Sequence, residues 1–512
     1  MEDHILKAMA TSVAFLAVLG LMMMVHIFWW RPKSVERTLR KQGIRGTSYR
    51  VFTGDEPEMK KSAKDSSAKP IALNAEIIPR AIPFYNNMVK RYGKVSLCWF
   101  GSIPRLIIGD AELIRLILED KKGDFVHQRL NPLVNLQHKG VATLEGEEGS
   151  KRRRLITPAF HFEKLKGMVP AFSSCCWNLI ERWQKLVEPQ GWCEIDVAPE
   201  LVALACDAIA RTAFGSNYQE GKELFELQKM QLPLLIEAYN SIYVPGFRFV
   251  PTRKNRRRYQ LYNKIIALLK NMIQQREEAM KRGELRAGLD LMDLLLQCKE
   301  ESNNDLTIED VIEECKLFYF AGQETTATLL TWTMICLSIH QNWQEKARQE
   351  VLEICGKRKP DSGTINRLKI VSMILHEVLR LFPPLPDVFR YTVRETKMGS
   401  LLIPAGVELC LSVMHVHYDT TYWGDDAPEF KPERFSEGVS NAYSEDQMAF
   451  FPFGWGPRIC IGQAFSLVEA KTVMAMILQH FSFQLSPSYT HAPYLNCNIK
   501  PQHGAPIILR HV

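Results

Sequence analysis

The ten residues from Phe453 to Gly462, FGWGPRICIG, constrain this chain more than any other segment. Gly456 permits a backbone turn and a close approach that a Cβ would block. Cys460 comes just before an apolar-periodic run, Gln463 to His480, which predicts a helix. At a helix N-terminus the macrodipole and the free N–H groups stabilise a thiolate and lower the thiol pKa from about 8.5. The segment therefore predicts a glycine-bent loop that presents one cysteine thiolate to a metal, with a guanidinium, Arg458, placed to bind a carboxylate.

Composition and charge exclude several classes of protein. The chain has 512 residues, of which 46% are apolar and 24% charged, as in ordinary folded proteins. Its net charge of +7 is mild for this length and indicates a basic face rather than a nucleic-acid binder. The twelve cysteines show no CxxC spacing, so neither a zinc ribbon nor a disulfide scaffold is indicated.

The N-terminal segment predicts a membrane anchor. Residues Ala8 to Trp30 are almost wholly apolar, and about 20 such residues span a bilayer core as a helix. Basic residues follow this run from Arg31 onward, which places the downstream chain on the cytosolic side. A cleaved signal peptide is the alternative, but its apolar region is shorter and its basic residues come first.

We expect three parts along the chain: an anchor at 1–30, a basic connector with an exposed loop at 31–70, and one catalytic domain at 71–512. The loop is predicted because Thr53 to Pro70 is polar and charged and lacks periodicity. From Ile71 onward no linker-like break or internal repeat appears in the sequence.

Helical patterns dominate the predicted domain. A capping pair, Thr307 and Asp310, starts a proline-free pattern that continues to Ile339 and predicts a rod of roughly 50 Å. A second helix, Lys369 to Leu381, ends before two prolines. Strand-like runs occur near 95–100, 106–109, 388–393 and 407–417.

The long helix contains the sequence AGQETT at 321–326. A glycine inside a helix costs about 1 kcal/mol relative to alanine, so we expect Gly322 to let the helix bulge and admit a small ligand. Glu324 and Thr325 place an acid and an alcohol in one turn, as proton delivery requires. The alternative is a solvated glutamate and a threonine that bonds back to a helix carbonyl.

Three other patterns allow more than one interpretation. Glu377 and Arg380 have the spacing of an intrahelical ion pair, which on a surface contributes little. The basic run 151–154 is dense enough for a nuclear address, which a membrane anchor makes improbable. His415 and His417 alternate on a predicted strand, but no carboxylate or cysteine partner at suitable spacing supports a metal site.

The loop around Cys460 resembles the proximal loop of the cytochrome P-450 haem-thiolate monooxygenases. The AGQETT turn resembles the oxygen-activation helix of the same family, and Glu377, Arg380 and the sequence PERF at 432–435 resemble its helix triad. The resemblance covers nearly the whole chain. It implies a mainly α fold, the cytochrome P-450 fold, with a large helical lobe around a long central helix and a small β-rich lobe behind the anchor.

The resemblance also implies a cofactor, haem b (iron-protoporphyrin IX), whose thiolate ligand favours O–O cleavage. It implies a role for each matching residue: iron ligation by Cys460, proton delivery by Thr325 and Glu324, propionate binding by Arg153, Arg390 and Arg458, further haem contacts by Phe453, Gly456, Gly462 and Ala321, and a structural triad of Glu377, Arg380 and Arg434.

Two positions depart from the family pattern. Gly149 stands where the family has a tryptophan four residues before Arg153, so a propionate contact is expected to be missing and haem retention weaker. Thr47 stands where related chains have proline, so a looser hinge after the anchor is expected.

The resemblance is nearest to the plant clan that includes secologanin synthase, triterpenoid oxidases and gibberellin and brassinosteroid hydroxylases. It implies hydroxylation of a lipophilic terpenoid or steroid-like molecule with O2 and electrons from NADPH–cytochrome P-450 reductase, at the endoplasmic reticulum membrane. Asp387 and Asn496 are polar members of the implied pocket, which either orient a substrate hydroxyl or face solvent. A haem-thiolate isomerase or dehydratase acting on hydroperoxides, and a non-catalytic, haem-poor membrane protein, remain alternatives.

Overall fold

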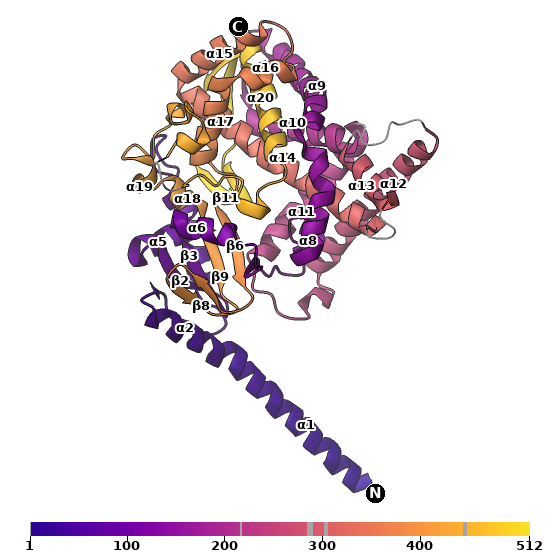
Figure 1. Ribbon diagram of the computed structural model, residues 1–512, viewed down its shortest axis with the longest axis vertical. Coiled ribbons are helices and arrows are strands. Elements are labelled where there is room, and N and C mark those ends of the chain that lie inside the picture. Colours follow the sequence, from indigo (N-terminus) through magenta and orange to yellow (C-terminus); the bar gives the residue numbers. More distant parts are fainter. Residues whose placement is uncertain (1, 216–217, 284–289, 302–305, 444–447) are drawn as a thin grey trace. The chain divides into compact units, whose positions relative to one another are not determined.

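The computed structural model describes residues 2–215, 218–283, 290–301, 306–443 and 448–512 (Figure 1). The fold is mainly α-helical, as predicted, and divides into two compact units. We call them the sheet unit and the helical unit. The sheet unit comprises the residues up to Ala68, Ile78–Gln128 and Asp387–Ser412, and the helical unit comprises Lys69–Ile77, Arg129–Pro386 and Val413–Val512.

The sheet unit is built on a six-stranded sheet with the order β1-β2-β3-β9-β6-β4. Its buried strands are rich in leucine, isoleucine and cysteine, as expected for a sheet covered by helices. Its elements are α1 (Glu2–Val25), α2 (Arg31–Lys41), β1 (Arg45–Gly46), α3 (Glu56–Ser67), α4 (Ile78–Ala81), α5 (Pro83–Tyr92), β2 (Val95–Phe100), β3 (Ile103–Ile108), α6 (Ala111–Leu118), β4 (Phe125–His127), β6 (Asp387–Thr392), β7 (Thr396–Met398), β8 (Leu401–Ile403) and β9 (Glu408–Ser412).

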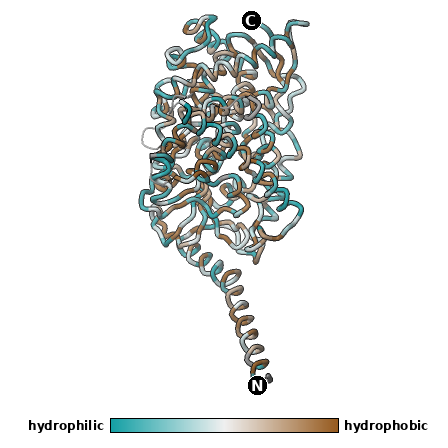
Figure 2. Tube along the Cα trace, turned by 90° about the vertical axis from the view of Figure 1, so that its right-hand side faces the viewer, coloured by the Kyte–Doolittle hydropathy of each residue, from teal (hydrophilic) through white to brown (hydrophobic). Residues whose placement is uncertain are grey.

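The predicted anchor is one continuous helical rod. A π-helical turn, His26–Trp30, joins α1 to α2, and the helix from His4 to Lys41 contains an apolar window of mean hydropathy 2.2 with none of it buried. Within the described part of the chain it is the one helix long and apolar enough to cross a membrane, and Figure 2 shows it as mostly hydrophobic. The Tyr49 hydroxyl donates to the carbonyl of Phe28 at 2.7 Å and so ties the rod to the sheet unit.

Two expectations for the connector are wrong. The segment expected as an exposed loop contains α3. Its first turn holds Pro57 and two glutamates, which are residues that commonly begin a helix. Thr47 does not loosen the hinge, because its N–H donates to Leu97 O at 3.0 Å and its hydroxyl to Asp55 Oδ2 at 2.5 Å. A proline could make neither bond.

The helical unit contains the remaining helices and two small sheets, with the orders β10-β13-β5 and β11-β12. Its elements are α7 (Asn135–His138), α8 (Gly146–Ile156), α9 (Phe162–Val187), β5 (Trp192–Asp196), α10 (Val197–Phe214), α11 (Tyr218–Tyr239), α12 (Arg253–Lys281), α13 (Leu291–Glu301), α14 (Ile308–Ile339), α15 (Gln341–Cys355), α16 (Ser362–Arg367), α17 (Lys369–Leu381), α18 (Val413–His417), α19 (Thr420–Trp423), α20 (Gln463–His480), β10 (Phe481–Leu485), β11 (Pro493–Asn496), β12 (Asn498–Pro501) and β13 (Pro506–His511).

Helix α14 runs through the core of the helical unit. The predicted capping box is present, since Thr307 and Asp310 exchange backbone and side-chain hydrogen bonds. Residues on every side of the helix are buried, as in a helix surrounded by protein. The predicted α17 and α20 also begin and end where expected. The predicted strand 407–417 is half wrong, because β9 ends at Ser412 and α18 follows.

Candidate active site

Cys460 lies in a loop that glycines bend before α20 begins. Gly454 and Gly456 have φ values of 69° and 68°, which side chains with a Cβ rarely adopt. The Cys460 N–H donates to Phe453 O at 2.9 Å and closes the loop. A Cβ on Gly462 would lie 3.9 Å from the Cys460 sulfur, so glycine keeps the space beside the sulfur open.

The Cys460 thiol differs from the other cysteines in its exposure. Among the described residues it is the one exposed cysteine, and the others are buried or half-buried. The surrounding protein desolvates the thiol and raises its pKa, against smaller lowering effects of the Gly462 N–H and the charge of Arg153. The Gly462 N–H at the start of α20 thus lowers this pKa as expected, but desolvation outweighs it and the net shift is upward. A metal cation deprotonates a coordinating thiol outright, so the chemistry of this donor still suits a haem iron.

One face of α14 is accessible although the helix is otherwise enclosed. From Val311 to Ser338 every residue is buried except Ala321, Gly322 and Thr325. Residues 321 and 325 are four apart and therefore share one side of the helix. Accessible residues in the middle of a buried helix mean that protein leaves space beside this turn, which fits the expected position of a planar cofactor and its substrate.

The structure gives Gly322 and Thr325 other contacts than those expected. α14 is a regular helix without a bulge, and a Cβ on Gly322 would lie 2.9 Å from Ile209 Cδ1 of α10. The glycine thus allows two helices to pack closely, which was not foreseen. The Thr325 hydroxyl donates to Ala321 O at 2.8 Å, the helix-internal bond that we weighed as the alternative.

Glu324 is neither solvated nor directed at Thr325. Its side chain is 9% exposed and forms an ion pair with Lys500 of β12, whose side chain is 24% exposed. Nothing in the sequence indicated this pair, because 176 residues separate the two partners.

Two of the three expected propionate-binding arginines lie near Cys460 and already have protein partners. Arg153 donates to Ile459 O at 2.5 Å, and Arg458 forms an ion pair with Glu145 at 2.8 Å. A Cβ on Gly149 would overlap the backbone carbonyl oxygen of Leu144 and lie 3.0 Å from Arg458 Nη2. A larger residue at 149 would therefore clash with this carbonyl and crowd the arginine, so glycine is a packing requirement here.

Arg390 and Asp387, in β6 of the sheet unit, are both hydrogen-bonded. Arg390 is buried and donates to Phe389 O at 3.0 Å and to His127 Nδ1 at 3.4 Å. Asp387 accepts a bond from Ser412 Oγ at 2.6 Å, and burial raises its pKa to about 6. Asp387 is thus half-buried and bonded to protein, so the interpretation in which it faces solvent is wrong.

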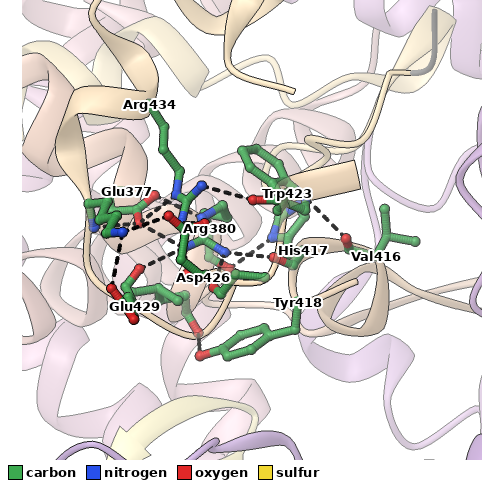
Figure 3. Close-up of polar contacts among 12 residues, drawn as sticks. Glu377, Arg380, Val416, His417, Tyr418, Trp423, Asp426, Glu429 and Arg434 are labelled. Carbon is green, nitrogen blue, oxygen red and sulfur yellow. Dashed lines mark hydrogen bonds and ion pairs between the residues drawn. The ribbon is translucent and has the colours of Figure 1, made fainter. Parts of the chain in front are cut away.

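The triad residues meet in the buried cluster of Figure 3. Arg380 makes a bidentate pair with Glu377 at 2.7 and 2.8 Å, and both side chains are fully buried. Arg434 Nε lies 3.7 Å from Glu377, and its other nitrogens bind Asp426 and the carbonyl of Trp423. The surface-bridge alternative is thus excluded for the Glu377–Arg380 pair.

His417 continues this cluster toward the cysteine loop. Its Nδ1 donates to Arg380 O at 3.0 Å, and its Nε2 accepts the Phe451 N–H at 2.9 Å. Both ring nitrogens are therefore occupied by main chain, which excludes the metal-ligand interpretation of this histidine. Desolvation lowers the pKa of His417 to about 3, so the ring is neutral.

Sequence reasoning missed several contributors. These are Glu145, Asp426 and Lys500, each of which forms an ion pair. Glu145 and Lys500 pair with residues distant in sequence, and Asp426 lies in an ordinary polar segment. Arg152, in the basic run 151–154, is buried and pairs with Glu314 at 3.0 Å, so it does not contribute to a basic surface.

Comparison with known proteins agrees with this geometry. Residues 72–498 match the family model described as Cytochrome P450. Cytochrome P450 CYP72A616 of Paris polyphylla is 48% identical over 99% of both chains. Secologanin synthase 1 of Catharanthus roseus is 43% identical over 99% of this chain and 98% of its own length. The fold matches a retinoic-acid-bound cyanobacterial protein, CYP120A1, with a TM-score of 0.77 at 20% identity, covering 92% of this chain and 99% of that structure.

Proposed function

Because this chain belongs to the cytochrome P450 family, whose members use thiolate-ligated haem, we propose that it is a membrane-anchored monooxygenase that hydroxylates a lipophilic terpenoid or steroid-like molecule. The net reaction takes one O2, two electrons from NADPH and two protons, and yields one alcohol and one water. The observation that carries the proposal is the accessible Cys460 thiol in a helical unit that also leaves Ala321 and Thr325 accessible.

The residues present fit the cofactor. Cys460 would hold the iron, and Gly462 keeps the space beside the sulfur clear. Arg153 and Arg458 would bind propionates. At Arg458 a propionate would either replace the Glu145 carboxylate or bind beside it. When bound, a thiolate-ligated haem supplies the oxygen chemistry that no side chain here offers.

The protein's own part is to position groups and move protons. Thr325 Oγ1 holds a hydroxyl proton on the accessible side of α14, and Glu324 supplies a carboxylate one residue away. The cluster of Glu377, Arg380 and Arg434 acts structurally, because it binds the carbonyls of His417 and Trp423, and the His417 ring accepts the Phe451 N–H two residues before the cysteine loop.

The substrate class rests on the relatives. The name of secologanin synthase 1 gives that relative a terpenoid-pathway product. We place the anchor at residues 1–30 and the catalytic domain at 71–512, with the domain on the cytosolic face of the endoplasmic reticulum. There it would receive electrons from NADPH–cytochrome P-450 reductase.

The proposal is tested with microsomes that contain the full chain and its reductase. We expect a ferrous–CO band of the thiolate type that Cys460→Ser abolishes, and NADPH-dependent hydroxylation of one member of a terpenoid and steroid panel. Product formation without NADPH would instead indicate an isomerase or dehydratase. Purified protein without haem would refute an enzyme of either kind.

A further inference from the structure

The β11–β12 hairpin connects an apolar cluster to α14. Cys497 at its tip has a φ of 64° and packs against buried side chains of the helical unit. Those side chains are Leu133, Val134, Leu235, Ala238 and Phe320. Leu495, two residues before the tip, is 41% exposed. The tip therefore combines a packed thiol with an accessible apolar side chain.

The base of the hairpin is fixed beside α14 by main-chain bonds. The Ile499 N–H donates to Pro384 O at 3.2 Å, and Trp332 Nε1 of α14 donates to Ile499 O at 2.7 Å. Lys500 is the next residue, so its side chain starts from a fixed point. Its ammonium group reaches Glu324, eight residues before Trp332 on the same helix.

The ion pair sets the direction of the Glu324 carboxylate. Hydrogen bonds between charged groups are stronger than neutral ones. The pair turns the carboxylate toward the hairpin, while Thr325 holds its hydroxyl on Ala321. The acid and the alcohol of this turn thus have separate partners, and one of those partners belongs to the hairpin.

We propose that Lys500 is a positioning residue that couples the Glu324 carboxylate to the β11–β12 hairpin. This inference rests on the proposed monooxygenase function. A carboxyl group held in one position can take a proton from water and pass it on. Displacement of the hairpin tip by a bound molecule would change the partner of that carboxylate.

The first test measures hairpin opening and needs no turnover. In the purified ferric holoenzyme, the alkylation rate of Cys497 is followed by site-resolved mass spectrometry, with half-buried Cys193 as internal reference. We expect a several-fold faster reaction in Lys500→Gln and wild-type behaviour in Lys500→Arg. Lys357→Gln, which removes an exposed charge from the same unit, is the matched control. An unchanged rate in Lys500→Gln overturns the coupling.

The second test measures proton delivery without an organic substrate. The measured quantity is the ratio of NADPH to O2 consumed in the presence of reductase. A ratio of one indicates reduction of O2 to hydrogen peroxide, and a ratio of two indicates reduction to water. We expect Lys500→Gln to lower this ratio toward one, with recovery in Lys500→Arg. Glu324→Gln should give the same ratio, and the double variant no further change. If the effects of the two single variants add up in the double variant, the functional pair is overturned. If the wild type shows no NADPH oxidation or no CO band of the thiolate type, the proposed function fails instead.

Discussion

Replacing Arg380 tests how the cysteine loop is supported. Its guanidinium has five N–H groups, and its nitrogens contact five acceptors. They are the two oxygens of Glu377 at 2.8 and 2.7 Å and the carbonyls of His417, Ala427 and Glu429 at 2.8, 2.6 and 3.1 Å. Arg380→Met keeps the apolar stem and removes every donor. Arg380→Lys keeps the charge and offers three donors.

The expected costs follow from burial. In Arg380→Met the fully buried Glu377 carboxylate retains the Lys431 N–H at 2.9 Å and Arg434 at 3.7 Å. Removing one partner of a buried pair costs about 3–5 kcal/mol. In Arg380→Lys at least two acceptors lose their donors, at about 1–3 kcal/mol each. We therefore expect about 2–6 kcal/mol for that variant.

The assay is urea unfolding of the purified holoenzyme, followed by circular dichroism and by the ferrous–CO band. Arg182→Met is the matched control, because Arg182 pairs with Glu200 at 2.8 Å but is 54% exposed. Such a surface pair contributes about 0–1 kcal/mol. If both Arg380 variants lose no more free energy of unfolding than this control, the cluster does not support the cysteine loop.

Three further outcomes are expected. Glu469 in α20 is fully buried without a hydrogen-bond partner, and desolvation raises its pKa well above 4.5. The protonated form stabilises the fold, and this stability is lost as pH rises above the pKa of the unfolded chain. The unfolding temperature of Glu469→Gln should therefore rise relative to that of the wild type from pH 4.5 upward, and parallel curves would contradict this. Gly149→Trp, which installs the residue of the family pattern, should clash with the Leu144 carbonyl, crowd Arg458 and lower haem content per protein; equal or higher haem content would show that the site accommodates an aromatic ring. Thr325→Ala should retain haem but divert electrons to peroxide, measured as peroxide per NADPH; an unchanged ratio would remove this hydroxyl from proton delivery.

Local patterns predicted the elements whose signals are contained within a few residues. The capping box of α14, the proline stop after α17 and the positive φ of Gly456 each depend on neighbours in the chain. α3 was missed because its helix-starting proline and glutamates lie in a polar stretch without an apolar face.

The candidate site was predictable in its residue types but not in its pairings. The motifs located Cys460, Glu324 and Arg458, yet their partners come from distant elements. Lys500 and Glu145 carry no local signal, since a lysine in a strand or a glutamate before a helix is ordinary. The direction of the Cys460 pKa shift was also out of reach, because it depends on how much protein surrounds the sulfur.

The neutral ring of His417 has a consequence for the whole centre. Its pKa of about 3, and that of about 4 for half-buried His376, lie below physiological pH. The imidazole that bridges Arg380 to Phe451 therefore keeps one tautomer across the cellular pH range. Changes in cellular pH thus leave this link between α17 and the segment before the cysteine loop unaltered.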